Sequence, residues 1–166
     1  ASVRYLYFHL RERALAKCGN DIADGAPETD FVSYNIRQLA GGALSGSLLK
    51  ERQKNPRVIG VKNSSMPVQD IQMWRDEGAI VFNGPDEQLL SGLAAGALGG
   101  IGGTYSAMPA LYLKIRELFL AGKMEEAREI QNEVCRILYT LCPAPRHLYA
   151  VLNAVTPPHA GPHPSA

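Results

Sequence analysis

Helical and strand patterns alternate along most of this 166-residue chain, and this alternation constrains the fold more than any other feature. Short apolar runs bounded by turn residues indicate strands, and the segments between them have the apolar spacing that is typical of helices. Strands joined by helices favour a parallel sheet over a helical bundle or a β-sandwich. The predicted strands are Phe31–Ile36, Arg57–Lys62, Ala79–Asn83 and Gly99–Gly102, and the predicted helices are Arg11–Ala23, Ser45 or Ser47 to about Lys54, Val68–Glu77 and Glu87–Ala97.

The spacing of the predicted strands indicates a particular α/β architecture. The strands recur roughly every 20 to 25 residues, which suits the repeating unit of a (β/α)8 TIM barrel. Four strands are clear, and Ser2–Tyr7 is a candidate for the end of a fifth. Because such a barrel has eight strands, we expect this chain to carry about the C-terminal half of one, with its last four to five strands in residues 1–105.

Two further helical patterns follow the strands. One begins at Pro109, a residue that suits a first helical position, and ends at Gly122. The other runs from Met124 to Leu141 with apolar residues on one face. We expect residues 106–155 to form an appended helical layer, and the Pro-rich residues 156–166 to be disordered.

Composition narrows the classes of partner. The net charge is +1 and no run of Lys and Arg stands out, which argues against nucleic acid and anionic membranes. No stretch approaches the ~20 apolar residues that span a bilayer. We therefore expect a small-molecule partner. The three cysteines lack the spacings of a zinc site or a disulfide framework, which favours a cytoplasmic setting, and the first residues lack the layout of a signal peptide and resemble the middle of a longer protein.

Lys62 and Tyr34 are the residues best placed for covalent chemistry. Each terminates a predicted strand, and barrel active sites lie at the carboxyl ends of the strands. A lysine that loses hydration there is more readily neutral, and a neutral amine can attack a ketone to form an imine. Tyr34, one β/α unit earlier, could transfer protons beside it. The structural alternatives are a lysine that reaches into water and a tyrosine that only packs.

Two loops at the same edge are candidates for ligand binding. Asp86 and Glu87 follow the third strand, where they could recognise a polyol or simply favour the start of the next helix. The glycine-rich segment 99–104 allows a ligand or another backbone to come close, but it is not a dinucleotide fingerprint. His159 and His163 lie in a Pro-rich segment that cannot place them on one helical face, so we predict no metal site.

Four motifs together resemble the N-acetylneuraminate lyase and dihydrodipicolinate synthase family of Schiff-base aldolases. Their content, order and separation are similar to those of the family, and the resemblance extends from about Ser2 to Val155. The motifs are Tyr34-Asn35-Ile36, Gly60-Val61-Lys62-Asn63-Ser64-Ser65, Asn83-Gly84-Pro85-Asp86-Glu87 and Gly99-Gly100-Ile101-Gly102-Gly103-Thr104-Tyr105.

The resemblance implies a lyase without a separate cofactor. Lys62 would form the imine with pyruvate or with the ketone of a sialic acid, and Tyr34 would move the proton. The motifs look more like the N-acetylneuraminate lyase branch, which implies cleavage to N-acetylmannosamine and pyruvate. Ser64, Asp86 and Glu87 would contact sugar hydroxyls, while Gly84 and Gly102 would let the chain approach the substrate. The full set of implied substrate-binding positions is Ser64, Gly84, Asp86, Glu87, Gly102 and Gly103.

Three departures from the family pattern accompany the resemblance. Arg37 stands where the family usually has Pro, and Arg4-Tyr5-Leu6-Tyr7 replaces a Thr-Pro-Tyr-Tyr-like piece. Gly103 occupies a place where some sialic acid lyases carry a serine. The resemblance also implies a hydroxyl pair that binds the pyruvate carboxylate in an N-terminal half, which we expect to be missing from this chain.

Three interpretations stay open. The chain is expected to act as a sialic acid lyase, as a dihydrodipicolinate synthase-like or sugar-acid aldolase, or as an inactive barrel half that serves as an interaction module. A half barrel leaves a sheet edge unpaired, so we expect a homo-oligomer or pairing with a missing N-terminal half.

Overall fold

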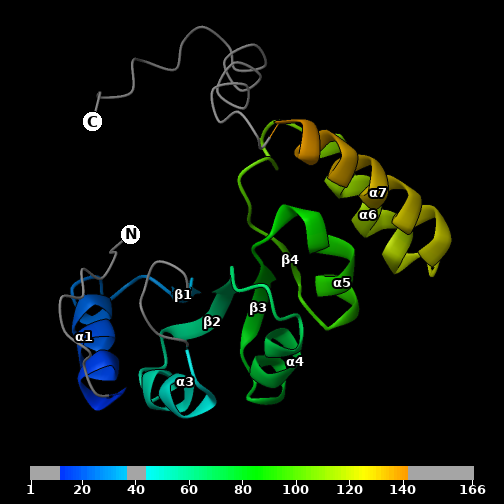
Figure 1. Cartoon of the computed structure of the whole chain (residues 1–166). Coiled ribbons are helices and arrows are strands. Elements are labelled where there is room, and N and C mark those ends of the chain that lie inside the picture. Colours follow the sequence, from blue (N-terminus) through cyan, green and yellow to red (C-terminus); the bar gives the residue numbers. More distant parts are fainter. Residues whose placement is uncertain (1–11, 37–43, 142–166) are drawn as a thin grey trace, which may run out of the picture. The chain divides into compact units, whose positions relative to one another are not determined.

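A computed structural model describes residues 12–36 and 44–141, which divide between two compact units, 1–102 and 103–166 (Figure 1). The predictions for Ser2–Tyr7, for Arg37, for the tail after residue 155 and for His159 and His163 lie outside the described residues. No helix in the described part is long and apolar enough to cross a membrane.

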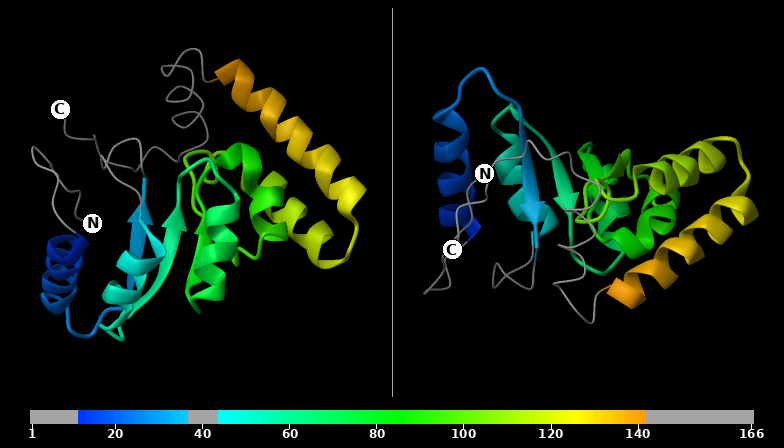
Figure 2. Two further views of the ribbon diagram at one scale, coloured as in Figure 1. Left: turned by 60° about the horizontal axis from the view of Figure 1, so that its bottom comes forward. Right: turned by 90° about the horizontal axis from the view of Figure 1, so that it is seen from above.

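The first unit contains a four-stranded parallel sheet in the order β1-β2-β3-β4, and the arrows in the left view of Figure 2 point in one direction. The predicted α/β class and parallel sheet are therefore confirmed, and the strand and helix order is that of part of a (β/α)8 barrel. The strands are β1 (Phe31–Asn35), β2 (Val58–Asn63), β3 (Ile80–Asn83) and β4 (Gly99–Gly100).

The helices of this unit alternate with the strands, as predicted. Ser45 caps its helix by accepting a hydrogen bond from Leu48 N at 3.1 Å. The predicted helix Glu87–Ala97 is wrong in extent: it opens as a short 3₁₀ turn and ends before Gly96, whose φ of +99° does not continue a helix. The helices are α1 (Glu12–Asp24), α3 (Gly46–Gln53), α4 (Gln69–Asp76), η1 (Asp86–Gln88) and α5 (Leu89–Ala94).

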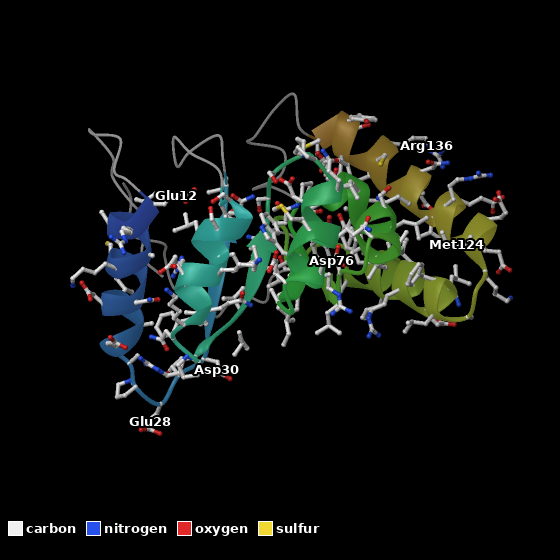
Figure 3. The ribbon with its side chains drawn as sticks, turned by 90° about the horizontal axis from the view of Figure 1, so that it is seen from below. Glu12, Glu28, Asp30, Asp76, Met124 and Arg136 are labelled. Carbon is white, nitrogen blue, oxygen red and sulfur yellow. The ribbon has the colours of Figure 1, made fainter. Side chains whose placement is uncertain are left out.

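The carboxylate of Glu12, labelled on α1 in Figure 3, links α1 to the start of α3. It accepts hydrogen bonds from Ser45 Oγ at 2.6 Å and Ser47 Oγ at 2.9 Å. The two hydroxyls hold the pKa of the Glu12 carboxyl below its usual value, because they favour the charged form. At the opposite end of α1, Arg57 pairs with Asp24.

The core of the first unit lies between the sheet and its helices. Trp74 and Ile71 of α4 are fully buried with Val61 of β2 and Val81 of β3. Because side chains alternate across a strand, burial of Val61 on this face directs its neighbour Lys62 to the other face. The complete cluster is Leu49, Val61, Ile71, Trp74, Ala79, Val81 and Ala97.

The second unit contains α6 (Pro109–Leu120) and α7 (Met124–Leu141), which pack against each other. Pro109 occupies the first turn of α6, and Gly122, with a φ of +73°, lies in the short connection, so both predicted helices are confirmed. Their buried side chains come from one stripe of each helix, as amphipathic packing requires. These residues are Tyr112, Ile115, Leu118, Ala127, Gln131, Val134 and Leu138.

Ile71→Ala should lower the free energy of unfolding by about 2–5 kcal/mol, because it leaves a cavity beside Trp74 in a fully buried cluster. Urea unfolding followed by the fluorescence of Trp74, the one tryptophan of the chain, measures the change. Met73→Ala is the matched control, since Met73 lies in the same helix but is 37% exposed. Equal losses in the two variants would contradict this description of the core.

Candidate active site at the carboxyl ends of the strands

Lys62 and Tyr34 lie side by side on adjacent strands. They are paired residues of β2 and β1, and Lys62 Nζ lies 4.2 Å from the centroid of the Tyr34 ring. An ammonium over a tyrosine ring is attracted by the negative face of the ring. Tyr34 is half exposed and Lys62 is partly buried, so both remain accessible to a ligand.

Phe82 extends this pair into a row of three. It is the partner of Lys62 on β3, and paired residues of parallel strands present their side chains on one face of the sheet. Lys62 is therefore flanked by Tyr34 on one strand and Phe82 on the other. Lys62 thus has an aromatic residue as its partner on each neighbouring strand, and it lies one residue before the end of its own strand.

The loops that follow β2 and β3 continue the sheet pairing past the strand ends. Ser64 N donates to Asn35 O at 2.8 Å, and Gly84 N donates to Asn63 O at 2.6 Å. A Cβ added at Gly84 would lie 2.2 Å from Ser64 Oγ and 2.4 Å from Asn63 O, far inside van der Waals contact. Because Gly84 has no side chain, the two loops can approach each other. Two predicted substrate-binding residues, Gly84 and Ser64, are therefore neighbours.

Asp86 and Glu87 begin η1 and differ in exposure. Asp86 is 8% exposed, whereas Glu87 is exposed to solvent. Both lie in the first turn of η1, so the stabilising interpretation also stays open for them. Sugar recognition by the pair stays a prediction.

Gly102 and Gly103 stand at the boundary of the two units. Gly102 is the last residue of the first unit and Gly103 the first of the second. Their predicted contacts with a substrate stay predictions. Just before them, Ile101 N donates to Asn83 O at 2.8 Å, which keeps this segment in register with β3.

Sequence reasoning missed a second row of residues at the strand ends. Asn35, Asn63 and Asn83 are the last residues of β1, β2 and β3, and all three are buried on the face opposite Lys62. The signal was present in the sequence, because each asparagine directly follows a member of the Tyr34, Lys62 and Phe82 row. The sequence-based predictions gave these three asparagines no role of their own.

Among the residues that the structure describes, no three His, Cys, Asp or Glu side chains are grouped closely enough to hold a metal ion. The described site presents an amine, a phenol and the polar groups of the neighbouring loops.

Parallel strands that alternate with helices, with a lysine and a tyrosine paired near the carboxyl ends of two strands, are the arrangement of part of a (β/α)8-barrel protein. Residues 2–156 match the Dihydrodipicolinate synthetase family, and the chain belongs to this family. The resemblance drawn from the four motifs is thereby confirmed.

Proteins named as N-acetylneuraminate lyases are similar to this chain over two thirds of its length or more. It is 56% identical over 158 residues to the N-acetylneuraminate lyase of Mediterraneibacter gnavus, which covers 93% of this chain and 50% of that protein. It is 39% identical over 113 residues to the N-acetylneuraminate lyase of Rhizobium meliloti, covering 67% of this chain and 38% of that protein. The chain thus spans about half the length, or less, of the curated relatives it matches.

A solved structure agrees with the described fold. A catalytic lysine mutant of the Ruminococcus gnavus sialic acid aldolase superposes with a TM-score of 0.81 at 58% sequence identity. The match covers 84% of this chain and 47% of that protein.

Gly84→Ala should destabilise the first unit by about 1–3 kcal/mol, because the added methyl group would meet the backbone of Asn63 and Ser64. Chemical unfolding followed by the fluorescence of Trp74 measures this loss. Gly99→Ala is the control, since a Cβ there meets nothing within 4 Å. A Gly84→Ala chain as stable as the Gly99→Ala chain would show that the two loops are not in close contact.

Proposed function

We propose that this chain is the lysine-bearing half of a sialic acid lyase that cleaves N-acetylneuraminate to N-acetylmannosamine and pyruvate. The observation that carries the proposal is the Lys62 amine 4.2 Å from the Tyr34 ring at the carboxyl ends of paired parallel strands. Its support from relatives is the 56% identity to a protein named N-acetylneuraminate lyase and the catalytic lysine named in the related aldolase structure.

In the proposed reaction, Lys62 Nζ attacks the ketone carbon of the open-chain sugar acid, and loss of water gives an iminium ion. Removal of the proton from the hydroxyl two carbons away lets that oxygen form an aldehyde as the adjacent carbon–carbon bond breaks. The bonding electrons move into the iminium and yield an enamine. Protonation of the enamine and hydrolysis then release pyruvate and return the amine of Lys62.

Tyr34 is the proposed carrier of the proton. A phenol can accept or donate a proton at the reacting hydroxyl when it lies within hydrogen-bond reach. Tyr34 is half exposed on the same face as Lys62, which supports a hydroxyl accessible to a bound substrate. The ring also covers one side of the amine, so it limits how the ketone carbon can approach.

The proposed substrate contacts come from the loops after β2, β3 and β4. Ser64, Asp86 and Glu87 would bind the sugar hydroxyls, since hydroxyl and carboxylate oxygens are suitable partners for a polyol. The close approach of Ser64 and Gly84 supports a shared binding surface of the two loops. Gly102 and Gly103 are the remaining proposed substrate-binding positions.

A second candidate is aldol chemistry with another acceptor, as in a dihydrodipicolinate synthase-like or sugar-acid aldolase. The match to the Dihydrodipicolinate synthetase family over residues 2–156 favours it. Both candidates use Lys62 in the same way and differ in the aldehyde. Assays with N-acetylmannosamine and with aspartate semialdehyde, each with pyruvate, separate them.

Borohydride trapping tests the covalent step. The N-terminal half of the Mediterraneibacter gnavus lyase is fused to this chain, and we call the product the completed chain. The completed chain is then treated with pyruvate and borohydride. We expect a stable added mass on the peptide that contains Lys62 and none in Lys62→Arg. Lys50→Arg is the matched control, because Lys50 is exposed and paired with Glu77. An unmodified completed chain, or an adduct that survives Lys62→Arg, would overturn the mechanism.

Tyr34→Phe should lower kcat by roughly 10²–10⁴-fold while changing KM much less, because it keeps the ring beside Lys62 and removes only the proton-carrying hydroxyl. Steady-state cleavage of N-acetylneuraminate by the completed chain measures both constants. Tyr139→Phe, at an exposed residue of α7, should leave them unchanged. Wild-type turnover by the Tyr34→Phe enzyme would remove the phenol from the reaction.

A further inference from the structure

Three asparagines form a buried row directly behind the Lys62 face of the sheet. Asn35, Asn63 and Asn83 are Cα partners on adjacent strands, so their side chains share one face. Their exposed fractions are 3%, 0% and 0%. A polar side chain with so little contact with water is retained at a cost unless its hydrogen bonds are made. The hydrogen bonds that these three amides make therefore show what the row does in the fold.

Each asparagine makes a hydrogen bond to the backbone of the loop that follows its own strand. Asn35 Oδ1 accepts from Leu44 N at 3.1 Å, at the entry to α3. Asn63 Oδ1 accepts from Ser65 N at 3.1 Å, directly after Ser64. Asn83 Nδ2 donates to Pro85 O at 2.7 Å, between Gly84 and Asp86. The row thus binds the backbone of the three loops that follow β1, β2 and β3.

The orientation of the central amide is fixed by its donors. Asn63 Oδ1 accepts from Asn35 Nδ2 at 3.1 Å as well as from Ser65 N, and neither of these groups can accept a hydrogen bond. The oxygen of Asn63 must therefore face Asn35, on the β1 side. The nitrogen of the same planar amide must then point the other way, toward Asn83 on β3.

One donor and one acceptor of this row have no hydrogen-bond partner among the described residues: Asn63 Nδ2 and Asn83 Oδ1. Both atoms are buried and belong to paired residues, and a buried polar atom without a hydrogen bond destabilises the fold. Gly92 of α5 leaves space beside Asn83, because a Cβ there would lie 2.5 Å from Asn83 Oδ1.

We propose that Asn63 Nδ2 donates to Asn83 Oδ1, and that the continuous amide row Asn35–Asn63–Asn83 is a positioning device for Lys62 and the substrate loops. This inference rests on the proposed function. Each asparagine follows a residue of the Tyr34, Lys62 and Phe82 row, so the buried amides and the side chains of that row lie on opposite faces of the same three strand ends. Holding the amides in register holds the amine beside the phenol and Ser64 beside Gly84.

Asn63→Asp in the completed chain tests the row with an almost isosteric change. One carboxylate oxygen can still accept hydrogen bonds from Asn35 and Ser65. The other oxygen replaces the Asn63 Nδ2 donor and faces Asn83 Oδ1, so the two oxygens repel each other. We expect kcat to fall at least ~10-fold at neutral pH, with KM less affected. As the pH falls and the carboxyl becomes protonated, it regains a donor, so the ratio of Asn63→Asp to wild-type kcat should rise.

Two further variants keep the proposal falsifiable if Asn63→Asp folds poorly. Gly92→Ala suits a helix but pushes its methyl group against the Asn83 amide, so it should lower kcat without touching the substrate face. Asn132→Asp, at an exposed position of α7, is the control and should leave kcat unchanged. Wild-type kcat in both Asn63→Asp and Gly92→Ala, or a variant-to-wild-type ratio that does not rise at low pH, overturns the positioning role.

A measurement on stability separates this inference from the proposed function. In urea unfolding, the double variant Asn63→Ala/Asn83→Ala should lose less than the sum of the two single variants, because the first deletion already breaks the shared hydrogen bond. Strictly additive losses would overturn that bond even in an active enzyme. A wild-type completed chain without lyase or trapping activity would instead overturn the proposed function, and the unfolding cycle would still decide on the row.

Discussion

The pairing of β1 with β2 is the interaction on which the rest of the described site depends. Its register puts Tyr34 opposite Lys62 and Asn35 opposite Asn63. Because side chains alternate along each strand, this single register creates an aromatic and amine row on one face and an amide row on the other. A shift by one residue would exchange the faces and break both rows together. Burial of Val61 in the core opposes such a shift.

The sequence allowed the order of elements and the main pair of the site to be predicted for a physical reason. The strand that contains Lys62 is a short apolar run between turn residues, and such a run can be recognised from the local sequence. The helices predicted between such runs then favour a parallel sheet. Once the strands are known to be parallel, residues near their carboxyl ends must meet at one edge. The proximity of Tyr34 to Lys62 follows from that geometry.

The features that escaped prediction depend on contacts between distant parts of the chain. The extent of α5 is limited by the positive φ of Gly96, which the run of small apolar residues before it does not reveal. Burial of Asn83 results from the approach of Gly92, nine positions later, and Asn35 is tied to Leu44 across a turn. From sequence alone, asparagine favours a turn, and its hydrogen bonds to distant backbone groups become visible only in the folded chain.

The placement of asparagine at three neighbouring strand ends has a physical rationale beyond this one site. Where a strand leaves the sheet, its backbone groups lose their regular partners, and buried N–H and C=O groups must find others. An aliphatic residue at position 35, 63 or 83 would fill the space but leave Leu44 N, Ser65 N or Pro85 O without its present partner. An amide has both a donor and an acceptor on one short side chain, so it can bind its own loop and still reach the next strand. The face that carries Lys62 can then remain open to a substrate, because the loops beside it are fixed from behind.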